Sequence, residues 1–281
     1  SLGPGFGCVK GVAQHLLEHG RPGTATDRLA MYADRTNTPA KPELIADVLD
    51  ALVTAPPEQQ QLVSSYELQR LLEMLRTSSL DDARLAGLEW QLLPGLGYGV
   101  PAPTLERRLA RDPEFFVQLL SLCFKRADGS SEGESSPDMV HNAYRLLHEW
   151  SVVPGSPEAG GQVDEAKLKD WLDRTLELLA ESGRTVIGQH YIGHIFAHAK
   201  EDGDGTWPTQ PVRDAIERLA NEEIERGFGT EIFNNRGVSS RGLTDGGRQE
   251  RDLVQRFENW EALIRDQWPR TASVLRSVAE G

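Results

Sequence analysis

The chain has 281 residues, of which 38% are hydrophobic and 26% are charged, and its net charge is −13 at pH 7. This composition is typical of a globular protein and excludes wholesale disorder, while the acidic balance argues against a general nucleic-acid or anionic-membrane binder. Two cysteines, Cys8 and Cys123, exclude a disulfide framework and a cysteine-based zinc site. No stretch approaches the roughly 20 apolar residues that a membrane-spanning helix needs.

The N-terminal residues lack the features of a signal peptide. Ser1 opens a Gly-rich stretch that has neither a basic region nor a long apolar region. At the other end, the apolar period continues to Val278, close to Gly281. We interpret the chain as a fragment of a larger protein; the alternative is a complete small protein after removal of a tag.

Apolar residues recur with a helical period along almost the whole first half of the chain. Thr24 or Thr26 is expected to cap a short helix that carries Leu29 and Tyr32. The other helices of this half are predicted at residues 9–17, 42–52, 63–75, 82–92 and 113–123.

In the second half, two stretches rich in Ser, Gly and Pro are predicted loops, at residues 127–136 and 152–162. Helices are expected to restart at Pro137 and after Asp164, which is a predicted cap flanked by Val163 and Leu168. The helical period then covers residues 185–200, 211–226 and 247–278, and Pro269 is expected to kink or divide the last of these.

These patterns predict an all-α fold, because no alternating run of β-branched residues is long enough for a sheet. The helices suit an irregular helical bundle or a degenerate α-solenoid built from helical hairpins. The 152–162 loop is the best candidate boundary. We therefore expect a helical-hairpin array over residues 1–151 and, over residues 152–281, a helical domain with a histidine stripe and an Arg/Gly-rich loop.

Several phrases of the sequence resemble the helical-repeat regions of large bacterial multidomain proteins. They are residues 15–22 (HLLEHGRP), 88–94 (LEWQLLP), 109–116 (LARDPEFF), 202–208 (DGDGTWP), 246–251 (GGRQER) and 268–272 (WPRTA). The resemblance implies a sensor or scaffold region and no chemistry of its own. No Gly-rich Lys-Ser/Thr phosphate loop is present, so no NTPase activity carries over.

The first candidate site is a histidine stripe. His190, His194 and His198 follow one another at four-residue spacing, and two such histidines can chelate a transition metal when a further ligand is nearby. On one straight helix the outer two would lie about 12 Å apart, and no further ligand is recognisable. We therefore expect a packed polar stripe and no metal cofactor, with His190 and His194 as weak metal candidates.

The second candidate resembles the start of a calcium loop. Asp202 and Asp204 alternate with glycine, but the twelfth position, where a calcium loop has glutamate, is Arg213. A tight turn with Trp207 as a hydrophobic plug is the preferred interpretation.

The third candidate is a predicted loop over residues 227–247. Six arginines against four acidic residues make residues 226–256 a basic island. The helix that opens after Gly247 could hold an anion at its N-terminus, clamped by arginine. Alternatively, the arginines pair with nearby acids and only hold the loop in place. We expect an ordered loop that contacts a ligand or partner through Arg236, Ser239, Ser240, Arg241 and Arg248.

Catalysis finds little support in the sequence. Cys8 and Cys123 lie in apolar helix faces, and the chain has no Gly-x-Ser-x-Gly elbow. The preferred hypothesis is a non-catalytic interaction or scaffold module of a larger cytoplasmic bacterial protein, without a cofactor, that recognises a protein partner or another domain of its own polypeptide. The alternative is a ligand-sensing or enzymatic domain whose site combines the His190, His194 and His198 stripe with the loop from Arg236 to Arg248.

Overall fold

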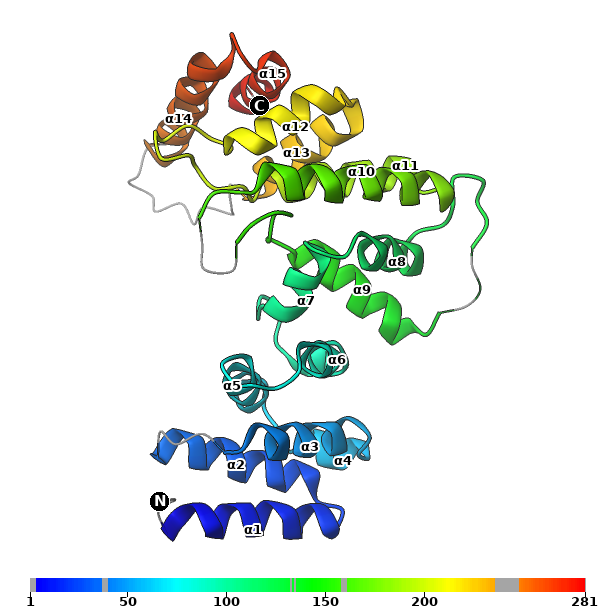
Figure 1. The fold of residues 1–281 in the computed structure, drawn as a ribbon, viewed down its shortest axis with the longest axis vertical. Coiled ribbons are helices and arrows are strands. Elements are labelled where there is room, and N and C mark those ends of the chain that lie inside the picture. The colour runs from blue at the N-terminus through cyan, green and yellow to red at the C-terminus, as the bar shows by residue number, and fades with distance from the viewer. Residues whose placement is uncertain are drawn as a thin grey trace. The chain divides into compact units, whose positions relative to one another are not determined.

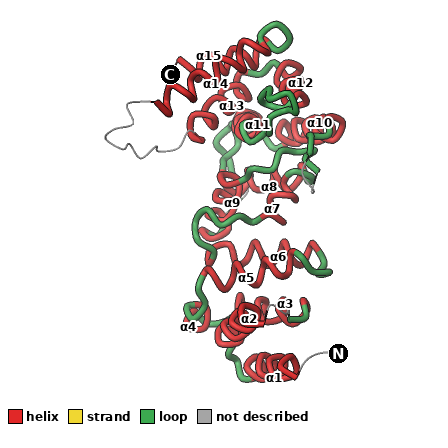
Figure 2. The backbone as a smooth tube through the Cα atoms, turned by 90° about the vertical axis from the view of Figure 1, so that its left-hand side faces the viewer, coloured by secondary structure: helices red, strands yellow, loops and turns green. Residues whose placement is uncertain are grey.

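A computed structural model describes the backbone of residues 4–36, 40–131, 133, 135–157, 161–235 and 248–280. It describes the side chains of these residues except 4–10, 36 and 248–250. Over this part of the chain the structure consists of helices and loops, without strands, which confirms the predicted all-α fold (Figure 2). The choice between bundle and solenoid stays a prediction. None of the described helices is long and apolar enough to span a membrane.

The chain divides into two compact units, Ser1–Leu105 and Glu106–Gly281. In the first unit, consecutive helices pack on one another, α1 on α2, α2 on α3 and α5 on α6 (Figure 1). Its helices are α1 (Pro4–Glu18), α2 (Pro22–Thr36), α3 (Pro42–Val53), α4 (Pro57–Gln60), α5 (Ser65–Arg76), α6 (Asp82–Leu92) and the 3₁₀ helix η1 (Leu93–Gly95). Helix α7 (Pro103–Leu109) begins in the first unit and ends in the second.

Local signals fix several helix starts in the first unit. Ser64 and Glu67 form a reciprocal capping box at α5, and the Asp81 side chain accepts a hydrogen bond from the Arg84 backbone N–H at α6. The expected cap at Thr24 or Thr26 is wrong. Helix α2 already begins at Pro22, and the Thr26 hydroxyl donates to the Pro22 carbonyl inside the helix, because proline suits the first helical turn.

The second unit has its core around packed aromatic rings. Phe116, Trp150 and Trp171 lie with their ring centroids 5.4–5.9 Å apart, and the Trp171 indole N–H donates to the Leu109 carbonyl. The remaining helices of this unit are α8 (Pro113–Cys123), α9 (Pro137–Glu149), α10 (Glu165–Glu181), α11 (Thr185–Phe196), α12 (Gln210–Leu219), α13 (Glu222–Asn235), α14 (Arg248–Ile264) and α15 (Pro269–Glu280).

The 152–162 loop, the predicted boundary, lies inside the second compact unit. Trp150 and Val153 beside it are buried, and the Ser151 hydroxyl donates to the Glu106 carboxylate over 2.9 Å. The Trp150 ring before the loop packs against the Trp171 ring after it, and the Trp171 indole donates back to the Leu109 carbonyl, so the chain on both sides of the loop shares one core. The expected division into a helical-hairpin array over residues 1–151 and a helical domain over residues 152–281 stays a prediction.

Two helix boundaries in the second half confirm the predicted signals. The Asp164 side chain accepts a hydrogen bond from the Lys167 backbone N–H and so caps α10. Pro269 begins α15 and separates it from α14, because proline cannot continue the backbone hydrogen bonds of a preceding helix.

A third boundary differs from the expectation. Residues 211–226 are divided at Ala220, whose φ of 45° is left-handed, and α13 then continues to Asn235. The expected loop therefore does not begin at Gly227. Phe228 and Ile232 are buried on the same face of α13, and this tertiary packing outweighs the unfavourable helix propensity of Gly227 and Gly229.

Candidate functional site

The histidine stripe does not lie on one straight helix. Helix α11 ends at Phe196, and the next turn is tightened by hydrogen bonds from Ala197 N–H to the His194 carbonyl and from His198 N–H to the Ile195 carbonyl. This tight turn brings the rings of His194 and His198 to a centroid separation of 5.4 Å. The expectation that the helix runs straight through residue 200 is therefore wrong.

Glycines allow α11 and α13 to approach closely. A Cβ atom on Gly193 would lie 2.0 Å from the Ile224 carbonyl oxygen, and one on Gly227 would lie 2.0 Å from the His190 carbonyl oxygen. Any side chain at either position would collide with the opposing backbone. This close contact sets the depth at which α13 side chains meet the histidines of α11.

Glu231 on α13 meets both histidines. Its Oε2 lies 3.1 Å from Nδ1 of His194, and its Oε1 lies 3.2 Å from Nε2 of His198. The Asn234 side-chain amide donates to Oε2 over 3.2 Å, which helps to fix the orientation of the carboxylate. Ligand atoms of the three residues all lie within 4.8 Å of one another. We call His194, His198 and Glu231 the His–Glu cluster.

Burial and hydrogen bonding have opposite effects on the pKa of Glu231 in the His–Glu cluster. His194 is 7% exposed and Glu231 is 5% exposed, whereas the His198 side chain keeps 21% of its surface accessible. Burial alone would raise the pKa of Glu231, but the hydrogen bonds from His194 and His198 outweigh burial and hold that pKa well below its usual range. Glu231 is therefore an anion beside two imidazoles.

The surroundings of His194 are aromatic. Its ring lies 6.3 Å from that of His148 on α9 and 5.8 Å from that of Tyr191. Nε2 of His194 is buried and makes no hydrogen bond with the described residues. Nδ1, which faces Glu231, is the one ring nitrogen of His194 with a polar partner among the described residues. This single hydrogen bond therefore determines the tautomer of the ring.

His190 is not part of the His–Glu cluster. It lies one helical turn before His194, where its ring makes an edge contact with that of Tyr191 at 6.4 Å. Partial burial lowers the pKa of His190, with the nearby Glu223 acting in the opposite direction. Of the two weak metal candidates, His194 is the one that lies within hydrogen-bonding distance of a described carboxylate.

The Asp202 carboxylate is occupied by hydrogen bonds from within the protein. Its carboxylate accepts from the Thr209 hydroxyl, the Gln210 backbone N–H and the Arg213 guanidinium, at 2.7–2.9 Å. Arg213, which stands where a calcium loop has glutamate, is therefore the ionic partner of Asp202. The preferred interpretation as a structural turn agrees with these contacts, and Trp207 is buried there against Phe228.

The predicted arginine site lies largely outside the described residues. Arg236, Ser239, Ser240 and Arg241 fall in the part of the chain that the structure does not describe, and of Arg248 only the backbone, at the start of α14, is described. The anion or partner contact of these residues, and their convergence with the histidine stripe, stay predictions.

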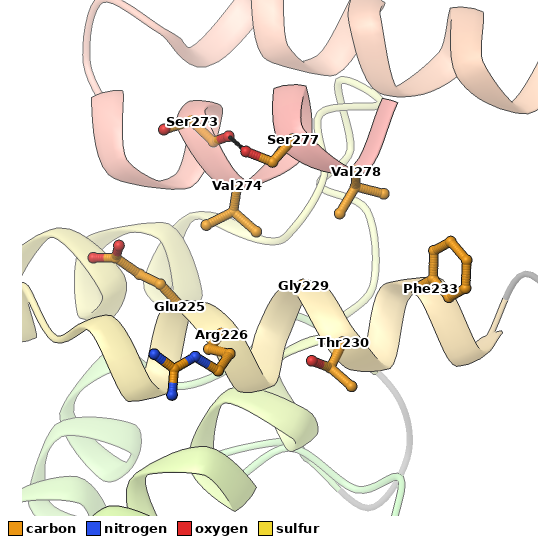
Figure 3. Close-up of a pocket in the computed structure, with 9 residues that line it drawn as sticks. All are labelled: Glu225, Arg226, Gly229, Thr230, Phe233, Ser273, Val274, Ser277 and Val278. Atoms are coloured by element: carbon orange, nitrogen blue, oxygen red, sulfur yellow. Dashed lines mark hydrogen bonds between the residues drawn. The ribbon is translucent and has the colours of Figure 1, made fainter. Parts of the chain in front are cut away.

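A groove of about 520 Å³ lies between α13 and α15 (Figure 3). Val274 and Val278 point from α15 toward α13, and Gly229 faces them. Phe233 lies at the far end of the α13 side and is 57% exposed. The lining residues are Glu225, Arg226, Gly229, Thr230, Phe233, Ser273, Val274, Ser277 and Val278.

Sequence reasoning missed both Glu231 and the groove. A signal for Glu231 exists, because Ile224, Phe228 and Ile232 mark the buried face of α13 and residue 231, seven positions after 224, falls on that face. A carboxylate at a core position needs a partner, and an unassigned histidine pair is an obvious one. The groove has no such signal, since it depends on how two helices are placed.

Comparisons with known proteins do not assign this chain to a family: neither the scan of protein-family models nor the searches of curated proteins and solved structures found a match.

Proposed function

We propose that this chain is a non-catalytic α-helical interaction module of a larger cytoplasmic bacterial protein. It recognises an amphipathic helix of a protein partner, or of another domain of the same polypeptide, in the groove between α13 and α15. The observation that carries this proposal is the groove itself, which is open, has an apolar strip of Gly229, Val274 and Val278 among polar lining residues, and ends at an exposed aromatic ring.

The groove has the chemistry of a helix-binding surface. Gly229, Val274 and Val278 give it an apolar floor and wall, against which a helix can place small aliphatic side chains. Phe233 offers a large apolar contact at one end, and burying such a side chain contributes about 1.5–3 kcal/mol. An exposed aromatic ring beside a groove is typical of a surface that is covered in a complex.

The net charge of the whole chain, and not the charges that line the groove, favours a basic partner. Glu225 is paired with Arg270 at 2.6 Å, and Arg226 is paired with Glu223 at 2.7 Å, so both lining charges are already balanced within the protein. The whole chain carries a net charge of −13. A partner helix with basic flanks would therefore be drawn to it by the long-range field, while the apolar groove supplies the contact.

The chemistry of the described free cysteine agrees with a non-catalytic role. Cys123 is partly buried at the end of α8, and burial raises the pKa of its thiol to about 11. The thiol is therefore protonated at neutral pH, and a protonated thiol is a poor nucleophile.

A photo-crosslinker in place of Ser277 tests the proposed function. In a lysate of the native cells it should form an adduct with a defined helical segment of one protein. A synthetic peptide of that segment should then bind the unmodified chain, and Phe233→Ser or Val274→Asp should weaken this binding at least about 10-fold, which corresponds to about 1.4 kcal/mol.

Val186→Ser, at an exposed apolar position on α11 outside the groove, is the matched control and should leave binding unchanged. The proposal is refuted if the peptide binds the groove variants and the control equally well, or if no adduct forms.

The alternative function, a ligand-sensing domain, is supported by a separate observation. His194, His198 and Glu231 converge from two helices in a largely buried cluster, which is the kind of polar grouping that a sensing site needs. A ligand held there would act directly on the contact between α11 and α13.

A further inference from the structure

The sequence offered two histidines for a metal but no third ligand, and the structure supplies one in Glu231. We propose that Nδ1 of His194, Nε2 of His198 and the carboxylate of Glu231 bind a divalent first-row transition metal ion, with zinc as the best match. This proposal does not depend on the helix-binding groove.

The spacing of the donor atoms suits a single small ion. Zinc binds imidazole nitrogen at about 2.0–2.1 Å and carboxylate oxygen at about 2.0–2.2 Å, so neighbouring ligand atoms in tetrahedral to octahedral sites lie about 3.0–3.4 Å apart. The two distances between nitrogen and oxygen are 3.1 and 3.2 Å. Because the two imidazoles face different oxygens of Glu231, the carboxylate can chelate the ion with both, or with one after a small rotation.

The chemistry of the donor set also suits a cation. Two imidazoles and one carboxylate are ligands that zinc accepts in proteins. Nε2 of His194 is buried and makes no hydrogen bond with the described residues. Ion binding moves the ring proton from Nδ1, where it faces Glu231, to the unengaged Nε2, so that the ion replaces the hydrogen bond between Nδ1 and Glu231.

The residues around the His–Glu cluster resemble those that support metal sites in proteins. The Asn234 side-chain amide donates to the Glu231 carboxylate and orients it, as supporting residues do around protein-bound metals. Three protein ligands leave a coordination position for water or another small ligand, and the partly exposed His198 gives the site access to solvent. The glycine contacts at Gly193 and Gly227 fix the helices that hold the ligands.

A second grouping on the surface has to be removed before the test. His15, Glu18 and His19 are all exposed and lie close together on and just after α1, so a simple metal titration would also report ions held there. The experiment therefore uses a His15→Gln/His19→Gln background, without a histidine tag.

In this background, zinc and cobalt(II) are titrated by calorimetry and by equilibrium dialysis with elemental analysis. We expect one equivalent to bind, a rise in melting temperature, and visible cobalt absorption of a low-coordinate site. His198→Gln and Glu231→Gln should each weaken binding at least about 10–100-fold, the loss that follows removal of a merely supporting residue.

His190→Gln is the matched control, because it removes a histidine from the same helix one turn away and should leave the affinity unchanged. The proposal is overturned if the background protein binds no equivalent of either metal, or if His190→Gln and His198→Gln weaken binding equally. If Glu231→Gln fails to fold, His198→Gln decides alone, since His198 is partly exposed and lies after the end of α11.

Discussion

Of the buried carboxylates in the described part of the chain, Glu89 and Glu231 are stabilised in different ways. Glu89 accepts hydrogen bonds from the backbone N–H groups of Thr104 and Leu105 at the start of α7, and its other oxygen pairs with Arg76 at 2.8 Å. Glu231 is balanced by imidazoles instead of a guanidinium. A buried carboxylate without such partners would lower the stability of the folded protein. Each glutamate therefore holds in place the element that carries its partners.

The partners of Glu231 lead to a prediction about pH. Because its pKa is lowered in the folded protein, the charged carboxylate contributes stability above the ordinary glutamate pKa of about 4.3, and this contribution is lost as pH falls further. The free energy of unfolding of the wild type should therefore exceed that of Glu231→Gln at pH 6–7, and the difference should shrink on acidification below about pH 4.3.

Urea unfolding with a chelator present, at a series of pH values, measures this difference without a contribution from bound metal. A difference that stays constant or grows on acidification would contradict the assignment of Glu231 as a stabilised anion.

At the scale of elements, the contact between α11 and α13 depends on glycine. Gly193→Ala and Gly227→Ala each place a methyl group about 2 Å from an opposing carbonyl oxygen, so the two helices must separate. Each variant should lose about 1–3 kcal/mol or more of stability, as overpacked cores do.

Gly87→Ala in α6 is the control, since a Cβ atom there meets nothing within 4 Å. This variant should be neutral or gain up to about 1 kcal/mol, because alanine has the higher helix propensity. Thermal or urea unfolding of the three variants checks the prediction, and equal behaviour of Gly87→Ala and Gly193→Ala would show that the helices do not meet as closely as described.

The whole molecule should show helix as its dominant signal. The described residues form helices and loops in both compact units, and the apolar period of the sequence is helical throughout. Far-ultraviolet circular dichroism of the full chain should therefore show strong helical bands. A fitted strand content near the ordinary globular level of about 20–25% would contradict the fold.

The sequence by itself determined the helices, because the signals for them are local. Apolar periodicity, the caps at Ser64, Asp81 and Asp164, and the prolines at the starts of α3 and α15 act within a few residues of their own position. Where a local signal misled, as at Thr26 and after Gly227, the helix was extended by proline at its start or by burial of one face.

Only the tertiary structure decided which polar groups meet. Glu231 lies 33 residues after His198 in the chain, and their 3.2 Å contact exists because Gly193 and Gly227 let two backbones touch and because the turn after Phe196 brings His198 beside His194. The groove between α13 and α15 likewise depends on how those helices are placed. Periodicity states which face of a helix is buried, but it does not state which helix covers that face, and a site built across two helices depends on that second choice.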